Sequence, residues 1–501
     1  LLVRLAVAAI ALGAIALALV RIGALERGIE TVEARVGDTP VTIRRLAGGP
    51  PAPAVVIAHG FAGSRPLMRG FAVTAARNGY VAVSFDFLGH GRHPAPMTGD
   101  VTREDGATAA LVAQLDEVAA FARALPGVEG GLAVLGHSMA GDVIARWATA
   151  EGDAVAATIG VSMFSPAVTA EAPRNLLMIA GEWEGWLATE ALRALRLAHG
   201  PDAAPGVDYG DHAAGTARRA VAAPAVEHIG VLYSRTAMAE AARWLDATFA
   251  RQGPGFADDR GPWVALLIAG LVALGWPLAR LMPRLAPPQG AGLRGWRFAV
   301  AALGPAVATP LILAPLELRF LPVAVGDYLA AHFALYGALT ALAMAALGAA
   351  RPRGVPWRVL APCAAGAAAF ALGALGWALD AYVSAFLPIP ARLPLLLALL
   401  PGTAAWFLAD EWLTRGPDAP RLAYPATKLA FLASLAAAVA LDLERLFFLI
   451  ILAPALALFF VVYGLFSRWA FARAGHPWVG GLANALVFAW AIAVTFPMLG
   501  A

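Results

Sequence analysis

A serine stands in the run Gly-His-Ser-Met-Ala-Gly at positions 136–141, between an apolar stretch and a stretch typical of a helix. Small residues around such a serine permit a sharp strand-to-helix turn that lifts the hydroxyl above the sheet. The N-terminus of the following helix favours negative charge beside that hydroxyl. The usual spacing is G-x-S-x-G, and Ala140 departs from it because the glycine comes one residue later. We predict that Ser138 is a nucleophile.

A serine nucleophile needs a general base to accept its proton, and histidine most often fills that role. His228 lies just after the last predicted strand, where a loop can carry its imidazole toward the serine. His212 is an alternative, but it precedes that strand. His228 is therefore the predicted base, and a surface histidine in a loop is the competing interpretation.

The base in turn needs an acid to orient it. The apolar run 176–181 is a predicted strand that ends in a glycine, and Glu184 stands three residues past that glycine. A loop at this point can swing a carboxylate toward an imidazole. Glu184 is the predicted acid, and Glu182 is the alternative two positions earlier.

Backbone N–H groups that stabilise an oxyanion would complete such a site. The glycine-rich run 58–64 follows a predicted strand and opens a helix, so we expect the N–H of Phe61 to be one donor. The N–H of Met139, next after the serine, is the second expected donor. We interpret His59 as a residue that buttresses the loop.

A second glycine-containing loop, at 86–92, follows the predicted strand 80–85. We interpret Asp86 and His90 as residues that fix this loop and not as catalytic groups. The histidines at 59, 90, 93 and 137 lack the spacing of metal ligands, and the only cysteine, Cys363, lies in an apolar stretch. The sequence therefore predicts neither a metal nor a cofactor.

The chain as a whole is too apolar for one soluble domain. Its 501 residues are 60% hydrophobic, and the mean hydropathy is +0.68. Charges are scattered through 28–252, whereas 253–501 holds long apolar stretches joined by short arginine-bearing loops. We predict an N-terminal anchor over 1–27, a globular domain over 28–252 and a multi-helix transmembrane domain over 253–501. The net charge of +3, without a basic run interleaved with aromatics, argues against nucleic acid as a partner.

The globular region alternates strands with helices. The clearest predicted strands span 41–45, 54–58, 80–85, 132–135, 156–161, 176–180 and 219–226. Such alternation is typical of a doubly wound, mostly parallel sheet. Chemistry in these sheets sits beyond the carboxyl ends of the strands, where the candidate residues fall.

The apolar region holds about eight segments near the length that crosses a bilayer. We place them at 263–283, 297–317, 321–349, 357–386, 392–412, 425–441, 445–467 and 478–499. A further apolar segment at 5–20 is predicted to be a retained anchor, with a cleaved signal peptide as the alternative.

Basic residues are distributed unevenly between alternate loops of this region. One set carries twelve, namely Arg280, Arg284, Arg294, Arg297, Arg351, Arg353, Arg358, Arg415, Arg421, Lys428, Arg468 and Arg473, and the other carries Arg319, Arg392 and Arg445. Because cytoplasmic loops are enriched in Lys and Arg, the first set belongs in the cytoplasm. The sequence therefore predicts a multi-pass protein of the cell inner membrane with its globular domain on the extracytoplasmic, periplasmic side.

Together these motifs resemble the α/β-hydrolase superfamily, and specifically its bacterial serine esterases and dienelactone-hydrolase-like members. The resemblance is carried by 59–61, 86–92, 136–141, Glu184 and His228, in the superfamily's order of serine, acid and histidine, and covers about residues 30–252. A glutamate where aspartate is commoner and Ala140 in the serine turn are its departures. The resemblance implies an α/β-hydrolase fold joined to an all-α polytopic transmembrane domain.

Two classes of function remain. The first is a membrane-embedded serine hydrolase that cleaves carboxylic esters of apolar or lipid-like substrates through an acyl-enzyme. The second is a transporter or sensor in which the hydrolase fold is a regulatory or binding module. Ionisable residues near the apolar segments, such as Asp380 and Asp410, are the kind a transporter uses, although predicted helix ends explain most of them. The complete set of Ser138, His228 and Glu184 favours the enzyme. The identity of the ester and the oligomeric state stay open.

Overall fold

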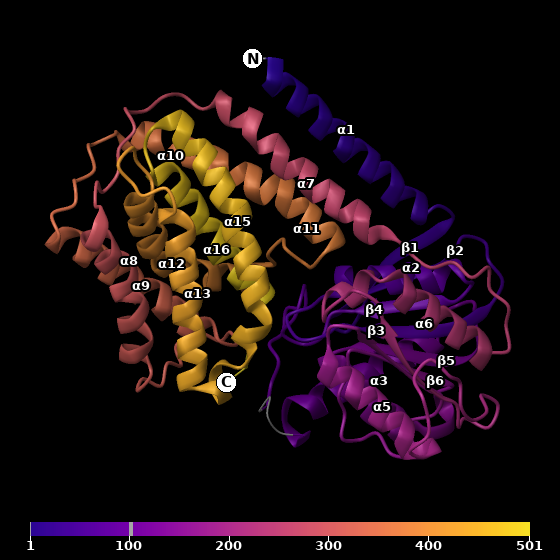
Figure 1. Ribbon diagram of the computed structural model, residues 1–501. Helices are drawn as coiled ribbons and strands as arrows, with labels where there is room; N and C mark the ends of the chain where they lie inside the picture. The colour runs from indigo at the N-terminus through magenta and orange to yellow at the C-terminus, as the bar shows by residue number, and fades with distance from the viewer. Residues whose placement is uncertain (1, 100–103, 501) are drawn as a thin grey trace. The chain divides into compact units, whose positions relative to one another are not determined.

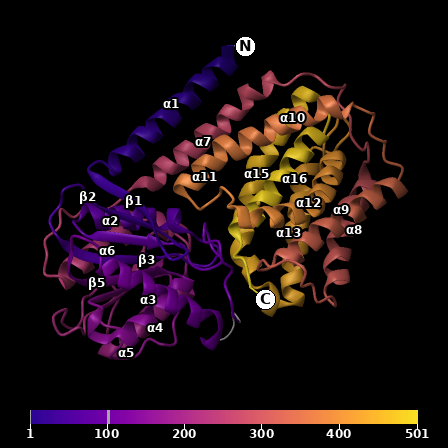
Figure 2. The ribbon, with the colours of Figure 1, turned by 180° about the vertical axis from the view of Figure 1, so that it is seen from behind.

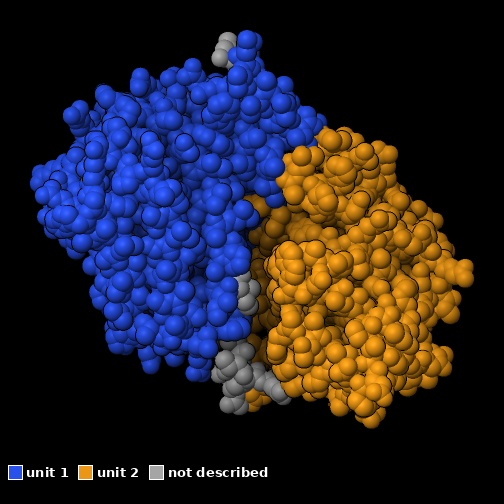
Figure 3. All heavy atoms as spheres, viewed as in Figure 1, with its two compact units in different colours: residues 1–16, 267–378, 386–496 blue, residues 17–266, 379–385, 497–501 orange. Residues whose placement is uncertain are grey.

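A computed structural model of the chain describes residues 2–99 and 104–500. The described chain divides into two compact units (Figure 3). The sheet unit comprises Leu17–Leu266, Leu379–Ala385 and Pro497–Ala501. The helical unit comprises Leu1–Ala16, Leu267–Ala378 and Phe386–Phe496. Two short segments from the apolar half of the sequence, at 379–385 and at the C-terminus, thus cluster with the sheet.

The sheet unit is built on one sheet, which has eight strands within the described residues (Figure 1). The strands are β1 (Ile29–Val36), β2 (Thr39–Leu46), β3 (Ala52–Ala58), β4 (Val81–Phe85), β5 (Val128–His137), β6 (Ala157–Val161), β7 (Leu176–Gly181) and β8 (Arg218–Ala223). Their order is β1-β2-β4-β3-β5-β6-β7-β8. The β1–β2 and β2–β4 pairs are antiparallel, and all other pairs are parallel.

Helices cover both faces of the sheet. Successive side chains of a strand point to opposite faces, so each central strand contributes to two separate cores. In β3, Ala54, Val56 and Ala58 join the core under α3 (Ala109–Arg123) and α4 (Met139–Glu151). Val55 and Ile57 join the core under α2 (Arg69–Arg77) and α6 (Arg235–Thr248). A third cluster packs α5 (Gly185–His199) on β7 and β8. Central parallel strands such as β3 and β7 are apolar on both faces, as expected for a buried parallel sheet.

The remaining helices are mostly long and apolar. They are α1 (Leu2–Leu25), α7 (Arg260–Leu278), α8 (Gly295–Leu313), α9 (Gly326–Ala346), α10 (Trp357–Ala369), α11 (Gly376–Tyr382), α12 (Leu393–Thr414), α13 (Ala423–Leu441), the short α14 (Leu443–Leu446), α15 (Phe448–Ala474) and α16 (Trp478–Thr495) (Figure 2). A π-helical turn, Phe370–Leu375, joins α10 to α11. Among the described residues, nine helical segments are long and apolar enough to cross a membrane.

Small residues let these helices approach closely. A Cβ added to Gly337 of α9 would lie 2.4 Å from the backbone of Ala405 in α12, and one added to Gly402 would lie 2.5 Å from the Ala330 carbonyl oxygen. Gly270 of α7 lies in the same way against α1, where an added Cβ would meet Ile15 at 2.9 Å. Close backbone approach at glycine is a common way for membrane helices to pack.

The predicted fold class is confirmed, with a mostly parallel sheet followed by an all-helical region. One strand is shorter than expected, because β8 stops at Ala223 and not at Val226. Pro224 follows immediately, and proline has no N–H to continue the ladder. Lys428 also differs from expectation, since it lies buried inside α13 and pairs with Asp410 of α12 instead of standing in a loop.

Candidate active site

Ser138 occupies a strained turn between β5 and α4. Its φ of 55° and ψ of −117° place it in a region that L-residues rarely adopt. The Ser138 N–H donates to the Val161 carbonyl oxygen at 2.9 Å, which ties the turn to the end of β6. A Cβ on Gly136 would lie 2.8 Å from the Ala140 carbonyl oxygen, so that position has room only for glycine. The turn thus presents its serine at the carboxyl edge of the sheet.

Packing explains why the glycine of this turn, Gly141, stands one residue later than in the usual pattern. Gly141 faces Met163, and an added Cβ there would lie 2.2 Å from the Met163 Cβ. Ala140 is fully buried with its methyl group accommodated in the core below β5. The tight approach therefore falls one residue later than the usual pattern has it.

The structure brings Ser138, His228 and Glu184 together in one hydrogen-bonded chain. The Nε2 atom of His228 lies 2.9 Å from the Ser138 Oγ. Its Nδ1 atom lies 2.6 Å from the Glu184 Oε1, to which Nδ1–H donates. The three residues follow β5, β8 and β7, so they meet at the carboxyl edge of the sheet. In this arrangement the imidazole can accept a proton from the hydroxyl while the carboxylate fixes its tautomer.

Glu184 is held on both oxygens. Its Oε2 accepts hydrogen bonds from the Gly181 N–H at 2.6 Å and from the Ser162 hydroxyl at 2.5 Å. Burial raises the pKa of Glu184, but the hydrogen bonds from His228, Ser162 and Gly181 outweigh it and leave the pKa below its ordinary value. The side chain is only 7% exposed. Glu184 is therefore an ionised acceptor with a fixed orientation.

His137 supports the loop that carries His228. Its Nε2–H donates to the backbone carbonyl oxygen of His228 at 2.9 Å. Burial, with a smaller contribution from the charge of His228, lowers the pKa of His137 to about 3. The neighbour of the serine is therefore neutral and places no fixed positive charge beside the site.

The loop after β3 approaches the serine directly. A Cβ added to Gly60 would lie 2.9 Å from the Ser138 Cβ. The loop is closed by the Gly63 N–H, which donates to the Gly60 carbonyl oxygen at 3.0 Å, and Ala62 has a φ of 56°. Phe61 lies within this loop, and Met139 is the first residue of α4. Both predicted N–H donors thus belong to segments that meet Ser138.

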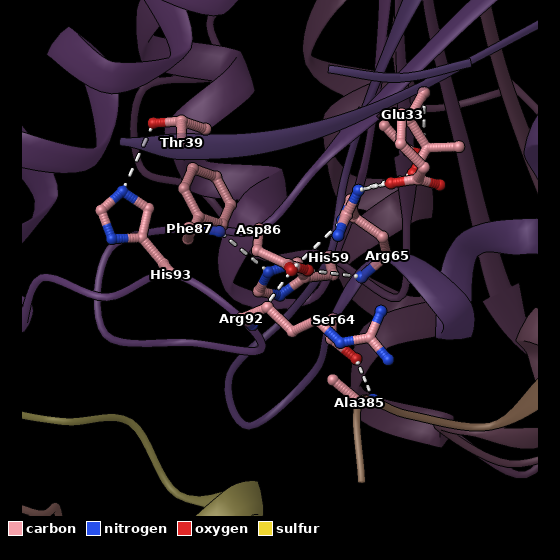
Figure 4. A network of polar contacts seen from close by, with 12 residues as sticks. Glu33, Thr39, His59, Ser64, Arg65, Asp86, Phe87, Arg92, His93 and Ala385 are labelled. Atoms are coloured by element: carbon pink, nitrogen blue, oxygen red, sulfur yellow. Dashed lines mark hydrogen bonds and ion pairs between the residues drawn. The ribbon is translucent and has the colours of Figure 1, made fainter. Parts of the chain in front are cut away.

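His59 and Asp86 fix the two loops, as Figure 4 shows. The His59 Nε2 accepts the Phe87 N–H at 3.1 Å, and Nδ1–H donates to the Gly60 carbonyl oxygen at 2.8 Å. Asp86 accepts from the Arg65 N–H at 2.8 Å and from the Arg92 N–H at 3.0 Å. These contacts link the loop after β3 to the loop after β4.

The alternative residues make contacts elsewhere. The Oε2 of Glu182 accepts the Ala225 N–H at 2.7 Å and holds the turn after β8. The Nδ1 of His212 lies 3.0 Å from the Thr248 Oγ1, and its ring packs on Trp244.

Two serines of the site were not predicted. Ser162 follows β6 directly and has a φ of 49°, so its place at a strand end was the available signal. Ser64 ends the loop after β3 and bonds to residues 384 and 385. No local pattern could have indicated that partner, because it lies 320 positions away.

The comparison with protein families agrees with this geometry. Residues 53–204 match a family model described as the alpha/beta hydrolase fold. The sheet unit has the α/β-hydrolase fold. No curated protein matches the chain.

Solved structures similar to this chain include several hydrolases. A dienelactone hydrolase from Anabaena variabilis has 17% identity and a TM-score of 0.31, covering 44% of this chain and 96% of that one. A hormone-sensitive lipase from a metagenome library has 17% identity and a TM-score of 0.32, covering 44% and 87%. A bacterial membrane phospholipase A has 14% identity and a TM-score of 0.31, covering 49% and 96%. Similarity at this level does not define a reaction.

Proposed function

We propose that the protein is a serine hydrolase that cleaves carboxylic esters through the triad Ser138, His228 and Glu184. The observation that carries this proposal is the imidazole of His228, placed 2.9 Å from the Ser138 Oγ and 2.6 Å from the Glu184 carboxylate. Hydrogen-bond reach on both sides is the geometric requirement for an activated nucleophile.

The proposed reaction uses each residue at a stated atom. His228 Nε2 accepts the proton from the Ser138 hydroxyl as Oγ attacks the ester carbonyl carbon. The N–H groups of Met139 and Phe61 stabilise the resulting oxyanion. The imidazolium then gives its proton to the departing alcohol, which leaves an acyl-enzyme. A water molecule then gives a proton to His228 Nε2 and attacks the acyl carbon. The bond from that carbon to Oγ breaks, the imidazolium returns its proton to Oγ, and the carboxylic acid leaves.

Exposed aromatic side chains beside Glu184 support an apolar substrate. Trp183 is 68% exposed and Trp186 is 65% exposed, and the two flank Glu184. Phe164, after β6, is 44% exposed and packs on Trp186 with ring centroids 5.3 Å apart. Several large apolar side chains gathered at a strand-end edge are typical of a surface that contacts apolar molecules. We therefore propose acyl esters of lipid-like character as the substrate class.

We further propose that the chain is a multi-pass protein of the inner membrane with the sheet unit on the periplasmic side. Nine apolar helical segments within the described residues support membrane integration. The excess of arginine in one set of loops supports the orientation. We propose that residues 28–252 form the folded core of the hydrolase.

Turnover of chromogenic esters tests this function. Full-length protein in detergent should hydrolyse acyl esters, with kcat/KM rising as the acyl chain lengthens. Ser138→Ala should abolish turnover, with a loss of about 10⁴-fold or more. Turnover that survives in Ser138→Ala would exclude the proposed nucleophile.

One observation favours a second candidate, a transporter with a hydrolase-fold module. Lys428 and Asp410 form a buried ion pair between α13 and α12, and Glu411 pairs with Arg415 at 2.9 Å. Ionisable residues inside membrane helices often mark a transport pathway. If transport is the function, Lys428→Met should abolish solute flux in vesicles. If the protein is a hydrolase, the same variant, which keeps Ser138, should still hydrolyse the ester.

A further inference from the structure

The segment 379–385 makes a row of hydrogen bonds to the rest of the sheet unit. The Asp380 carboxylate pairs with the Arg92 guanidinium at 2.5 Å, and the Ala381 carbonyl oxygen accepts from Arg69 at 2.9 Å. The Tyr382 carbonyl oxygen accepts from the Tyr233 hydroxyl at 3.0 Å. The Ser64 Oγ lies 2.9 Å from the Ser384 Oγ and accepts the Ala385 N–H at 2.7 Å. The segment comprises the last residues of α11 and the turn that follows it, before the apolar helical segment Pro390–Thr414. The end of one apolar helix and the turn after it are thus part of the sheet unit.

The partners of this segment lie on loops that carry the proposed chemistry. Ser64 ends the loop that approaches Ser138 through Gly60. Arg92 lies in the loop after β4, and its N–H bonds to Asp86. Tyr233 ends a short 3-10 helix that begins two residues after His228. One segment therefore touches three loops at the carboxyl edge of the sheet.

Ser64 connects the 379–385 segment to the proposed oxyanion loop, 59–64. Its side chain is fully buried, and its hydroxyl bonds to the Ser384 hydroxyl. The same hydroxyl accepts the Ala385 N–H (Figure 4). The next residue, Arg65, gives its N–H to Asp86. The loop 59–64 is thus held at one end by His59 and at the other by residues of the 379–385 segment.

The C-terminal segment holds the loop after β4 in a similar way. Met97 gives its N–H to the Met498 carbonyl oxygen at 2.8 Å, and the Met498 N–H donates to the Gly89 carbonyl oxygen at 2.9 Å. Leu499 pairs with Met97 as a parallel bridge and packs on the core under α3 and α4. Both segments lie at the C-terminal ends of apolar helices, and both are bound to loops at the same edge.

We infer that residues 379–385 position the oxyanion loop of the hydrolase, with Ser384 and Ala385 acting through Ser64. This inference rests on the proposed function. Ser384 and Ser64 are positioning residues in this inference, since they act through the loop 59–64 that carries Phe61. The consequence is that the geometry of the oxyanion donors depends on the end of α11 and the turn after it, so the catalytic unit is incomplete without that part of the chain.

The kinetic test uses Ser64→Ala in the full-length protein, because this substitution removes both hydrogen bonds to the segment. A loop that shifts by a fraction of an ångström loses stabilisation of the transition state, so kcat should fall about tenfold to a hundredfold with KM unchanged within about twofold. The affinity for an alkyl boronic acid, which forms a tetrahedral adduct on Ser138, should fall by a similar factor. Ser384→Ala, which keeps the Ala385 N–H contact, should show a smaller loss in the same direction, and Ser384→Thr should restore kcat.

Controls separate the possible failures. Ser434→Ala removes a buried hydroxyl that bonds to His332 within the helical unit, and it should leave kcat and boronate affinity unchanged. Unchanged kcat in both Ser64→Ala and Ser384→Ala would overturn the inference while leaving the hydrolase intact. A fall in kcat without a fall in boronate affinity would overturn it too, because the defect would then lie outside the oxyanion site. Turnover that persists in Ser138→Ala would instead remove the proposed function itself.

A crosslink tests the contact without relying on activity. In a Cys363→Ala background, Ser64→Cys combined with Ser384→Cys places two thiols where the hydroxyls are 2.9 Å apart. Mild oxidation of the full chain in membranes should form a disulfide between the two positions, detected by mass spectrometry after digestion. Ser64→Cys alone should give no intramolecular disulfide. Failure of the double variant to crosslink would show that the segment does not lie against Ser64.

Discussion

At the scale of single residues, the two ring nitrogens of His228 have different partners and different proposed roles. One faces the Ser138 hydroxyl and the other faces Glu184, whose second oxygen is held by Ser162 and the Gly181 N–H. An imidazole anchored in this way keeps the tautomer that leaves Nε2 free to accept a proton. Glu184 therefore matters through its charge and its orientation.

Substitution of the two neighbouring glutamates distinguishes the acid. Glu184→Gln should lower kcat by about 10⁴-fold, because an amide facing Nδ1 selects the wrong tautomer. Glu182→Gln is the matched control, since Glu182 accepts the Ala225 N–H in the turn after β8, and its kcat should stay within about threefold. Steady-state hydrolysis of one chromogenic ester measures both. If Glu182→Gln loses activity and Glu184→Gln keeps it, Glu182 would be the acid instead.

We expect burial of His137 to make the free energy of unfolding sensitive to acid. Its pKa is lowered from 6.5 to about 3 by burial, so between these pH values the unfolded chain binds a proton that the folded chain does not. The free energy of unfolding therefore falls as pH drops below about 6.5, by at most about 1.4 kcal/mol per pH unit from this group. The thermal unfolding midpoint of His137→Gln should fall less between pH 7 and pH 5 than that of the parent protein. Equal pH dependence in the two proteins would contradict a neutral, buried His137.

At the scale of elements, the loop after β3 and the turn after β5 are packed against each other. Gly60→Ala should lower kcat about 10²-fold or more, because a methyl group 2.9 Å from the Ser138 Cβ and 2.9 Å from the His137 Nδ1 must displace the loop or the turn. Gly185→Ala is the matched control, since an added Cβ there meets nothing within 4 Å. Rates of ester hydrolysis compare the two, and a Gly60→Ala enzyme as active as Gly185→Ala would show that the loop is not where we place it.

The sequence predicted the elements and much of the candidate site, because both follow from local patterns. A short continuous apolar run such as 54–58 indicates a strand buried on both faces, and strand ends identify where chemistry can gather. What it could not predict are contacts between distant segments. Ser64 with Ser384 is such a case, since neither residue has a local pattern that names its partner. Lys428 was misplaced for the same reason, because only the folded helices bring Asp410 beside it.

At the scale of the whole molecule, the arrangement of charges sets the expected orientation. With Lys428 buried in α13, eleven basic residues remain in one set of loops or in the helix turns beside them, against three on the other side, so the bias persists. Alkaline phosphatase fused after residue 252 should therefore be active, and a fusion after Arg297 should be inactive. Reporter activity in whole cells measures both fusions. The opposite pattern would place the sheet unit in the cytoplasm.

Covalent labelling of the serine tests the central claim most directly. A fluorophosphonate reacts with a serine only where a base activates the hydroxyl, so the full-length protein in native membranes should gain one adduct. Mass spectrometry should locate that adduct on Ser138. Ser138→Ala should take up no label, and Glu184→Gln should react far more slowly. Labelling at another serine, or labelling that persists in Ser138→Ala, would contradict the proposed triad.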